Sequence, residues 1–356
     1  MAEKTRVLPA EWAPQAGVLL TWPHAASDWG PTLSAVEPVF VAIAEAIARR
    51  EVVVIACHDD AVARRVRGLL ARAGVERSRV ALHVVPCDDT WARDHGPITV
   101  IEDGLPRVLD FTFNGWGGKF PAAQDDVIPA RLHALGAFGA AALEEVPLVL
   151  EGGSIESDGV GTILTTERCL LSRGRSGLDV PGLEAALQEH LGARRVLWLR
   201  HGHLEGDDTD GHIDTLARFC DPGTIAYQAC DDVADAHHAE LRAMAAELAA
   251  LRTEAGAPYR LVPLPWPRPR FAEGGRRLPA SYANFLIIDG AVLVPTYDDP
   301  ADAEALARLS AAFPGREVIG IDCLPIIEQG GSLHCLTMQL PRPLALGPGT
   351  AGASDE

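Results

Sequence analysis

The sequence predicts a mixed α/β protein with internal pseudosymmetry. Segments in which apolar residues recur with a helical period are followed by short β-rich runs, and hairpin-like pairs of strands lie between these units. Strand–helix–strand units separated by hairpins return about five times along the 356 residues. A doubly wound nucleotide-binding fold fits less well, because the nearest glycine-rich candidate, Gly159-Val160-Gly161, has Leu164 where the third glycine belongs.

The units can be placed along the chain in order. The helical period predicts helices over 35–49, 59–73, 126–138, 183–191, 234–255 and 301–313. Short β-rich runs predict strands over 51–57, 79–85, 194–199, 259–264 and 317–323. Paired runs predict hairpins over 98–111, 153–166 and 285–297. In the last hairpin, Asp289-Gly290 is a type I′ turn signal between two apolar runs. No low-complexity linker interrupts the chain, so we expect one domain over 1–345 and a disordered acidic tail over 346–356.

Composition and charge narrow the class of function. Apolar residues make up 47% of the chain and charged residues 22%, as in ordinary globular proteins that bury a core. With 31 basic and 49 acidic residues, the formal charge is −18. A field of this sign repels phosphate backbones, which disfavours general nucleic-acid binding. The same field attracts cations, so it points to a small, positively charged substrate.

Compartment and assembly follow from what the sequence lacks. It has no run of about 18 consecutive apolar residues, so we expect no membrane span, and its N-terminus lacks the apolar segment of a signal peptide. The 7 cysteines are odd in number and never form a CxxC pair, which argues against a disulfide framework or a structural zinc knuckle. We therefore expect a cytoplasmic protein. The sequence leaves open whether it forms a homo-oligomer.

Cys335 is the candidate nucleophile. It follows Gly330 and Gly331 and begins an apolar strand. A thiol in this position is ordinarily a buried core residue, but glycines permit close backbone approach to a ligand. A cysteine nucleophile also needs a base and a partner that orients the base.

His212 is the best candidate for that base. His212 and Asp214 are two residues apart, so in an extended chain they face the same side. The alternative is a solvated acidic turn. A calcium loop fails, because aligning Gly211 with the glycine of such a loop puts Gly206 at the first ligand position. Zinc is a further alternative, since His201-Gly202-His203 lies nearby, but no HExxH motif or cysteine pair completes a site.

Two more carboxylates stand at the ends of predicted elements. Asp94 follows Arg93, and such a neighbouring pair is often a structural ion pair. Glu151 closes an apolar run and meets Gly152-Gly153, where a buried carboxylate is costly unless it is paired with a cation. One thiol, one imidazole and three carboxylates would together suit a planar cationic electrophile such as a guanidinium.

At this point the residues resemble a known family. The chain looks like agmatine deiminase and the bacterial peptidylarginine-deiminase-type proteins, within the guanidine-modifying pentein superfamily. The similarity rests on motifs in the right order over nearly the whole chain, at 8–24, 90–100, 113–120, 150–171, 207–219, 279–287 and 329–341. It implies a five-bladed pseudosymmetric α/β-propeller of ββαβ modules, a pentein, around a central active site.

The resemblance also implies roles for the residues. The nucleophile falls on Cys335, the acid–base histidine on His212, and the guanidinium-binding acids on Asp94, Glu151 and Asp214. It implies hydrolytic deimination through a covalent thiouronium intermediate, with no metal and no organic cofactor. The segments FNGWGGKF at 113–120 and GGSLHC at 330–335 differ from the FNAWGG and GGGNIHC of agmatine deiminases; these departures leave the chemistry intact and bear on the substrate tail.

The implied substrate is agmatine, converted to N-carbamoylputrescine and ammonia, a step toward putrescine. Trp91 and Trp116 could line the methylenes of its tail and Asp208 could meet its ammonium, although packing aromatics and a solvated acidic loop explain these residues equally well. The alternatives are a deiminase of free or peptidyl arginine, a related amidinotransferase, and a non-catalytic binding module. An arginine carboxylate would need a cation, for which Arg93, Lys119 and Arg173 are candidates.

Overall fold

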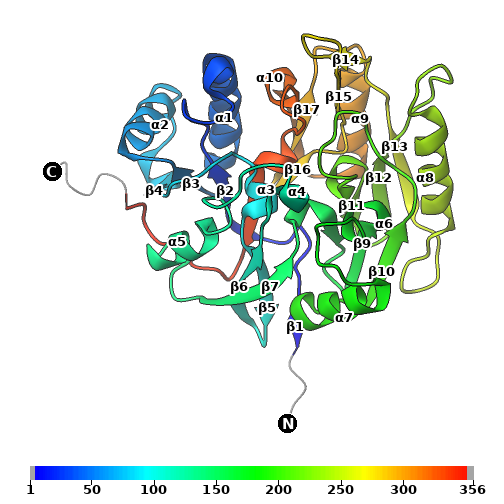
Figure 1. Ribbon diagram of the computed structural model, residues 1–356, viewed down its shortest axis with the longest axis horizontal. Coiled ribbons are helices and arrows are strands. Elements are labelled where there is room, and N and C mark those ends of the chain that lie inside the picture. Colours follow the sequence, from blue (N-terminus) through cyan, green and yellow to red (C-terminus); the bar gives the residue numbers. More distant parts are fainter. Residues whose placement is uncertain (1–4, 351–356) are drawn as a thin grey trace.

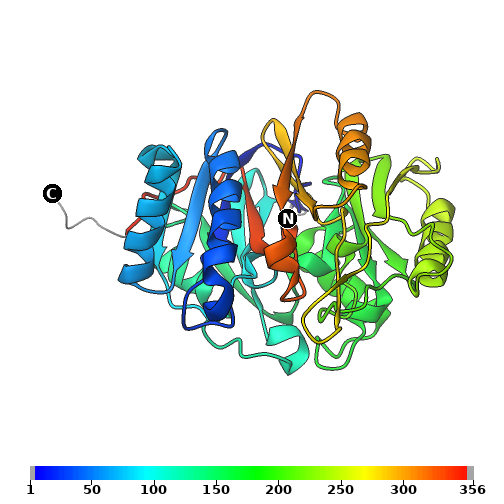
Figure 2. The same ribbon diagram turned by 90° about the horizontal axis from the view of Figure 1, so that it is seen from above.

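One arrangement of strands recurs five times in residues 5–350, the part of the chain that the computed structural model describes. In each case an antiparallel pair of strands is followed by a helical crossover and a third strand, which pairs in parallel with the second. The longer helices lie at the periphery (Figure 1, Figure 2), and the short helices α3 (Ala92–His95) and α4 (Gly115–Gly118) lie near the middle of the view in Figure 1. The expected α/β repeat is confirmed at this level.

Four of the units run in chain order. The second unit comprises β5 (Ile98–Glu102), β6 (Leu105–Thr112), α5 (Ile128–Ala134) and β7 (Ala142–Val149), with β1 (Arg6–Val7) added beside β5. The third comprises β8 (Ile155–Ser157), β9 (Thr162–Thr166), α6 (Glu167–Leu170), α7 (Val180–Leu191) and β10 (Arg195–Leu199). The fourth comprises β11 (Ala217–Asp221), β12 (Thr224–Gln228), α8 (His238–Ala250) and β13 (Arg260–Leu264). The fifth comprises β16 (Leu286–Ile288), β17 (Ala291–Thr296), α9 (Asp302–Ala312) and β18 (Glu317–Asp322).

The first unit joins the two ends of the chain. Its sheet is ordered β19 (Thr337–Pro341), β2 (Gln15–Thr21), β3 (Val52–Cys57) and β4 (Val80–Val84), with α1 (Leu33–Ala48) and α2 (Asp60–Arg72) as its crossovers. Strand β19 runs antiparallel to β2, with Thr337 opposite Leu20. Strand β19, the last in the described residues, therefore completes the sheet to which β2 belongs. A short hairpin, β14 (Arg270–Phe271) and β15 (Arg277–Leu278), stands outside the repeats.

The predicted helices and strands are found within a few residues of their expected bounds, and apolar faces bury as the periodicity indicates. In α1, Val36, Phe40, Ile43 and Ile47 are fully buried at helical spacing. The stretch Gly30–Ala48 is apolar and long enough to cross a membrane by length and composition alone, but half of its most apolar window is buried inside the protein. A core helix of a globular protein has the same properties.

The turn type predicted at Asp289-Gly290 is wrong. Ile288 pairs with Ala291, so the loop has two residues as expected, but only Gly290 has a positive φ, at 75°. A type I′ turn needs a positive φ at both residues. Asp103-Gly104, in the hairpin of β5 and β6, meets that condition with φ values of 51° and 81°.

The start of the predicted tail contacts the rest of the chain. Leu346 packs against the apolar cluster that contains Phe138 and Leu340, and the Gly347 amide donates to the Ala137 carbonyl at 3.0 Å. The remainder of the expected tail, 351–356, lies outside the described residues.

Candidate active site

The candidate site is built from equivalent positions of the five units. Asp94 lies in α3 (Ala92–His95), just before β5, and Glu151 precedes the turn η3 (Gly152–Ser154) that leads into β8. His212 immediately precedes η4 (Ile213–Thr215), and Asp214 lies within this turn, just before β11. Cys335 lies in η5 (His334–Leu336), just before β19. The fifth position, before β16, holds Asn284, which the sequence analysis missed.

Cys335 is held by Asn284 and faces Asp214. The thiol is almost fully buried, with 4% of the residue exposed. Asn284 Nδ2 donates to Cys335 Sγ at 3.3 Å, and Asp214 Oδ2 lies 3.7 Å from the sulfur. Burial, followed by the charges of Asp214 and Asp94, raises the pKa of the Cys335 thiol well above its ordinary value. The thiol is therefore protonated unless a positive charge is brought beside it.

Asp94 is oriented by donors from two loops. Trp116 Nε1 donates to Asp94 Oδ2 at 2.9 Å, and the Gly153 amide donates to Asp94 Oδ1 at 3.1 Å. Burial and the nearby charge of Glu151 raise the pKa of Asp94 to about 7. Trp116 itself has a positive φ of 55°, a conformation that non-glycine side chains seldom adopt outside constrained sites.

His212 lies behind Asp94 and is fully buried. Its Nδ1 is 3.5 Å from Asp94 Oδ1, and its Nε2 is 4.0 Å from Glu151 Oε2. Neither ring nitrogen has a hydrogen-bond partner within the described part of the chain. Burial, then the positive charges of Arg175 and Lys119, lower the pKa of His212 well below its usual value. The imidazole is therefore neutral, as a general base must be.

Gly153 leaves room for these groups to converge. A Cβ at this position would lie 2.6 Å from His212 Nδ1, 2.7 Å from Asp94 Oδ1 and 3.2 Å from Asp214 Oδ2. No side chain fits there without displacing them. The sequence analysis noted the double glycine after Glu151. The geometry explains why the second of them, Gly153, carries no side chain.

Glu151 has an internal partner, Arg175. Arg175 Nε lies 2.8 Å from Glu151 Oε1, and both side chains are buried, with 1% and 0% exposed. Arg175 also reaches Asp210 Oδ2 at 3.4 Å. Burial raises the pKa of Glu151, and the charge of Arg175 opposes that rise. The cation that the sequence demanded for Glu151 is therefore Arg175, which was missed because it lies in a glycine- and serine-rich loop after α6.

A second buried chain of charges supports Asp214. His334 Nδ1 lies 2.8 Å from Asp214 Oδ2, and His334 Nε2 lies 2.7 Å from Glu11 Oε2. Glu11 also binds Arg93 at 3.2 Å and Arg218 at 3.0 Å. Arg93 is therefore an internal cation that pairs with Glu11. The sequence analysis did not single out Glu11 or His334, although both lie inside the quoted motifs.

The buried groups open onto one cavity of about 400 Å³. Asp94 and Cys335 line it, while His212, Glu151 and Asp214 stand behind them. All three residues predicted to bind the substrate tail, Trp91, Trp116 and Asp208, line it as well. The other charged groups of its lining are Asp28, Asp89, Glu328 and Arg276. The cavity is thus acidic, with one basic side chain at its wall.

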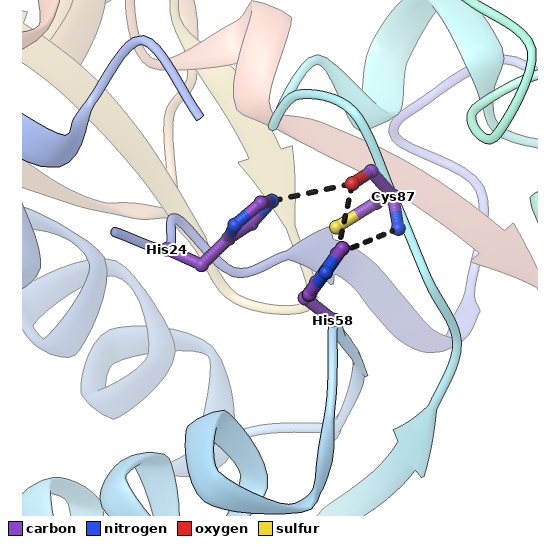
Figure 3. Close-up of side chains that lie close together, drawn as sticks. All are labelled: His24, His58 and Cys87. Atoms are coloured by element: carbon purple, nitrogen blue, oxygen red, sulfur yellow. Dashed lines mark hydrogen bonds between the residues drawn. The ribbon is translucent and has the colours of Figure 1, made fainter. Parts of the chain in front are cut away.

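Two sets of side chains could in principle hold a metal ion. In the described residues these are Glu151, Cys169 and His212, and separately His24, His58 and Cys87. The first set lies in the candidate site, but the Arg175 guanidinium already binds Glu151 and its charge opposes a second cation there. The imidazole rings of the second set are stacked, with centroids 4.0 Å apart and planes inclined by 18°, so their lone pairs run nearly parallel rather than toward one ion (Figure 3). His201 and His203 belong to neither set; they face Glu247 and Glu240.

Comparison with known proteins finds relatives over nearly the whole chain. The model of the Porphyromonas-type peptidyl-arginine deiminase family matches residues 7–341. Agmatine deiminase from Stutzerimonas stutzeri is 36% identical, over 94% of this chain and 95% of its own. Among solved structures, agmatine deiminase from C. jejuni with substrate bound is 34% identical, with a TM-score of 0.89 over 97% of this chain and 99% of its own.

Two further solved structures have a higher and a much lower sequence identity to this chain. A protein from Porphyromonas gingivalis, named as a candidate arginine deiminase, is 53% identical, with a TM-score of 0.89 over 95% of this chain and 98% of its own. An amidinotransferase from Microseira wollei, 13% identical with a TM-score of 0.52 over 95% of this chain and 98% of its own, shares the fold alone. Matched over almost its whole length, the chain belongs to the Porphyromonas-type peptidyl-arginine deiminase family.

Proposed function

We propose that this protein is a hydrolytic deiminase that converts agmatine and water to N-carbamoylputrescine and ammonia. The observation that carries the proposal is the position of Cys335, whose sulfur lies on the wall of an acidic cavity, 3.7 Å from Asp214. The names of the relatives support it, because the agmatine deiminases match 94% or more of this chain. The product would feed putrescine synthesis in the cytoplasm.

Asp94, Glu151 and Asp214 hold the guanidinium in this proposal. A guanidinium is planar, stays charged at neutral pH and offers paired donors that match carboxylate oxygens. The buried carboxyl groups of Asp94 and Asp214 both have raised pKa values. Burial disfavours their charged forms, and so does the charge of Glu151 beside Asp94 and that of Asp94 beside Asp214. A bound cation would relieve that cost, so these carboxyl groups favour a cationic ligand.

The same cation activates the nucleophile. With the guanidinium beside it, the Cys335 thiol loses its proton to His212, and the thiolate attacks the central carbon to give a tetrahedral adduct. The imidazolium of His212 then protonates the departing ammonia, which leaves a covalent thiouronium on Cys335. Neutral His212 next takes a proton from water, and the hydroxide attacks the same carbon. Collapse of the second adduct breaks the C–S bond and restores the thiol with the proton that His212 holds. The hydroxyl oxygen of the adduct forms the C=O bond of the neutral product and gives its proton to water, so that the released ammonia ends as ammonium.

The charges of the cavity favour agmatine over arginine. Trp91 and Trp116 would cover the methylenes of the tail, and Asp208, with Asp28, Asp89 and Glu328, would receive its ammonium. Arginine would bring a carboxylate into this acidic field. Arg93 and Lys119 are already paired, with Glu11 and Asp210 respectively.

A second candidate is deimination of free or peptidyl arginine. Arg276, on the cavity wall, is the observation that favours it, because it could receive a carboxylate. Ammonia release from agmatine, arginine and a peptide ending in arginine, measured side by side, decides between the two. We expect the highest kcat/KM with agmatine and turnover without any added amine, which an amidinotransferase would require. Absence of ammonia release from agmatine would overturn the proposal.

We also propose that the five repeated units are the blades of one pentein propeller within a single catalytic domain over 1–345. The shared strand order supports this, as does the use of one position per unit, Asp94, Glu151, Asp214, Asn284 and Cys335, to build the site.

A further inference from the structure

Lys119 is unusual in this chain by residue type. The 31 basic residues include only two lysines, Lys4 and Lys119, and the others are arginines. Lys119 is thus the single lysine in the part of the chain that the structure describes, and it directly follows the glycine-rich turn α4. A lysine ammonium is a compact charge with three donors, whereas an arginine guanidinium is a planar fork. A position that needs one donor point between two acceptors therefore favours lysine.

The Lys119 ammonium connects the turn α4 to the loop 207–211. Its Nζ lies 2.8 Å from Asp210 Oδ1 and donates to the Asp208 carbonyl oxygen at 2.7 Å. Asp210 is itself held from the other side, because its Oδ2 lies 3.4 Å from Arg175 Nη1. Lys119 therefore joins a glycine-rich turn to a carboxylate that is anchored on the buried Arg175.

The turn that Lys119 holds has a strained backbone. Trp116 has φ 55° and ψ 47°, in the left-handed region, and the three glycines of α4 also have positive φ values. A non-glycine residue stays in this region only where its surroundings hold it there, and the glycines contribute no side chains to do so. At its two ends the turn is anchored by Asn114, whose Nδ2 donates to the Gly174 carbonyl oxygen at 2.6 Å, and by Lys119.

Trp116 links this turn to the active site. Trp116 and Asp94 are both buried, and Trp116 Nε1 donates to Asp94 Oδ2 at 2.9 Å. This bond fixes one oxygen of the Asp94 carboxyl group, and the Gly153 amide fixes the other. A shift of the turn would therefore release one side of a carboxyl group that we expect to hold the guanidinium.

The same contact closes a wall of the cavity. Trp116 and Phe120 line the cavity from the side of α4, and Asp208 and Thr209 line it from the loop 207–211. The Lys119 ammonium bridges these two segments, although Lys119 itself is not among the lining residues. Lys119 therefore acts on the site through its neighbours.

We propose that Lys119 is a positioning residue, which holds Trp116 against Asp94. Its bonds to the loop 207–211 also keep the wall of the cavity closed. The inference rests on the proposed deimination and assigns to it a residue that does not contact the substrate. The alternative is an ordinary surface ion pair, since the side chains of Lys119 and Asp210 are 39% and 30% exposed. Pairs of that kind contribute little, so the two roles predict different results.

Kinetics with agmatine test the positioning role. Lys119→Met keeps an unbranched side chain without the charge, and we expect it to lower kcat about tenfold with a change in KM of about threefold or less, because the guanidinium still binds but is misaligned. Lys119→Arg should recover kcat to within about threefold of the wild type, since it keeps the charge but not the compact head. Arg308→Met is the matched control, because Arg308 and Glu304 form a similarly exposed pair on α9, and it should keep the wild-type kcat.

Amide hydrogen exchange of the full-length chain tests the structural half of the proposal without turnover. The amides of Gly118 and Lys119 donate to the carbonyls of Asn114 and Gly115, each at 2.9 Å, so their exchange reports opening of the turn. We expect the peptide over 113–120 to exchange about tenfold faster in Lys119→Met than in the wild type, Lys119→Arg or Arg308→Met, with equal exchange elsewhere.

The two measurements separate this inference from the proposed function. If the wild type releases no ammonia from agmatine, the proposed function fails, and the exchange over 113–120 then decides whether Lys119 holds the turn. Unchanged exchange there in Lys119→Met would overturn the inference in either case, and faster exchange throughout the chain would do the same by assigning Lys119 to global stability. Wild-type kcat in Lys119→Met, or a rise in KM alone, would also overturn it, because Lys119 would then form a surface contact or touch the substrate directly.

Discussion

The guanidinium of Arg175 lies 2.8 Å from Glu151 Oε1, so the site that we expect to bind a guanidinium already contains one. The two side chains are buried together, and Arg175 extends the contact to Asp210. This pair fixes Glu151 behind His212 and leaves Asp94 and Asp214 as the acids nearest Cys335. In the proposed function Glu151 therefore meets the substrate guanidinium from a position that Arg175 fixes.

Replacing Arg175 should destabilise the fold. Arg175→Ala leaves the Glu151 carboxylate buried without its cation, at a cost of about 3–5 kcal/mol in the free energy of unfolding. Urea unfolding followed by circular dichroism measures it. Arg194→Ala is the matched control, because its bridge to Glu254 is exposed on both sides and should cost about 1 kcal/mol or less. Equal losses in the two variants would contradict a buried structural role for Arg175.

Replacing Cys335 should separate binding from chemistry. Cys335→Ala is expected to release no ammonia from agmatine above background, while agmatine still binds, since the carboxylates remain. Calorimetric titration and an ammonia assay measure the two properties. Cys230→Ser, at a cysteine that does not line the cavity, should keep full turnover. Ammonia release by Cys335→Ala at the wild-type rate would remove Cys335 as the nucleophile.

The pH profile should report the charge of Asp94. Burial and the charge of Glu151 raise its pKa to about 7 in the free enzyme. Below that pH the carboxyl group gains a proton and loses its attraction for a guanidinium, so kcat/KM for agmatine should fall about tenfold per pH unit on the acid side. Above it the carboxylate is charged and binding is favoured. Asp208→Asn should keep this fall in kcat/KM on the acid side. The fall should lie roughly between pH 5 and 7, so a flat wild-type profile over that range would count against the assignment.

A methyl group at Gly153 should disable catalysis. An alanine Cβ would lie within 2.7 Å of both His212 Nδ1 and Asp94 Oδ1 and displace them. We expect Gly153→Ala to lower kcat by roughly 100-fold, as small misplacements of reacting groups do. Gly68→Ala, in helix α2 where the nearest atom to the new methyl is 3.4 Å away, should retain wild-type kcat. Unchanged kcat in Gly153→Ala would show that the imidazole and the acid need not converge there.

Local patterns predicted the elements and the candidate residues that the structure brings together, but not the contacts made across units. Periodicity placed the helices and strands, and short motifs identified Cys335, His212, Asp214, Asp94 and Glu151. Arg175 and Asn284 were missed, because their roles depend on partners far away in sequence. The position of Asn284 before β16 could have revealed it, had the repeat been used to compare the five units.

The error at Asp289-Gly290 has the same origin. The dipeptide is a local signal for a type I′ turn, but Asp289 Oδ1 accepts from the Gln15 amide at 3.2 Å, and its other carboxylate oxygen faces Arg342 at 3.6 Å. Contacts with both ends of the chain therefore hold this aspartate in a conformation that the dipeptide alone does not favour.

The pairing of β19 with β2 gives the protein a built-in order of assembly. Strand β2, near the N-terminus, gains its antiparallel neighbour only when β19 has been made, and Cys335 stands immediately before β19. Closing a sheet across nearly the entire polypeptide is a late and slow event. A chain that stops before β19 therefore leaves one edge of β2 unpaired and lacks Cys335, the nucleophile that we propose.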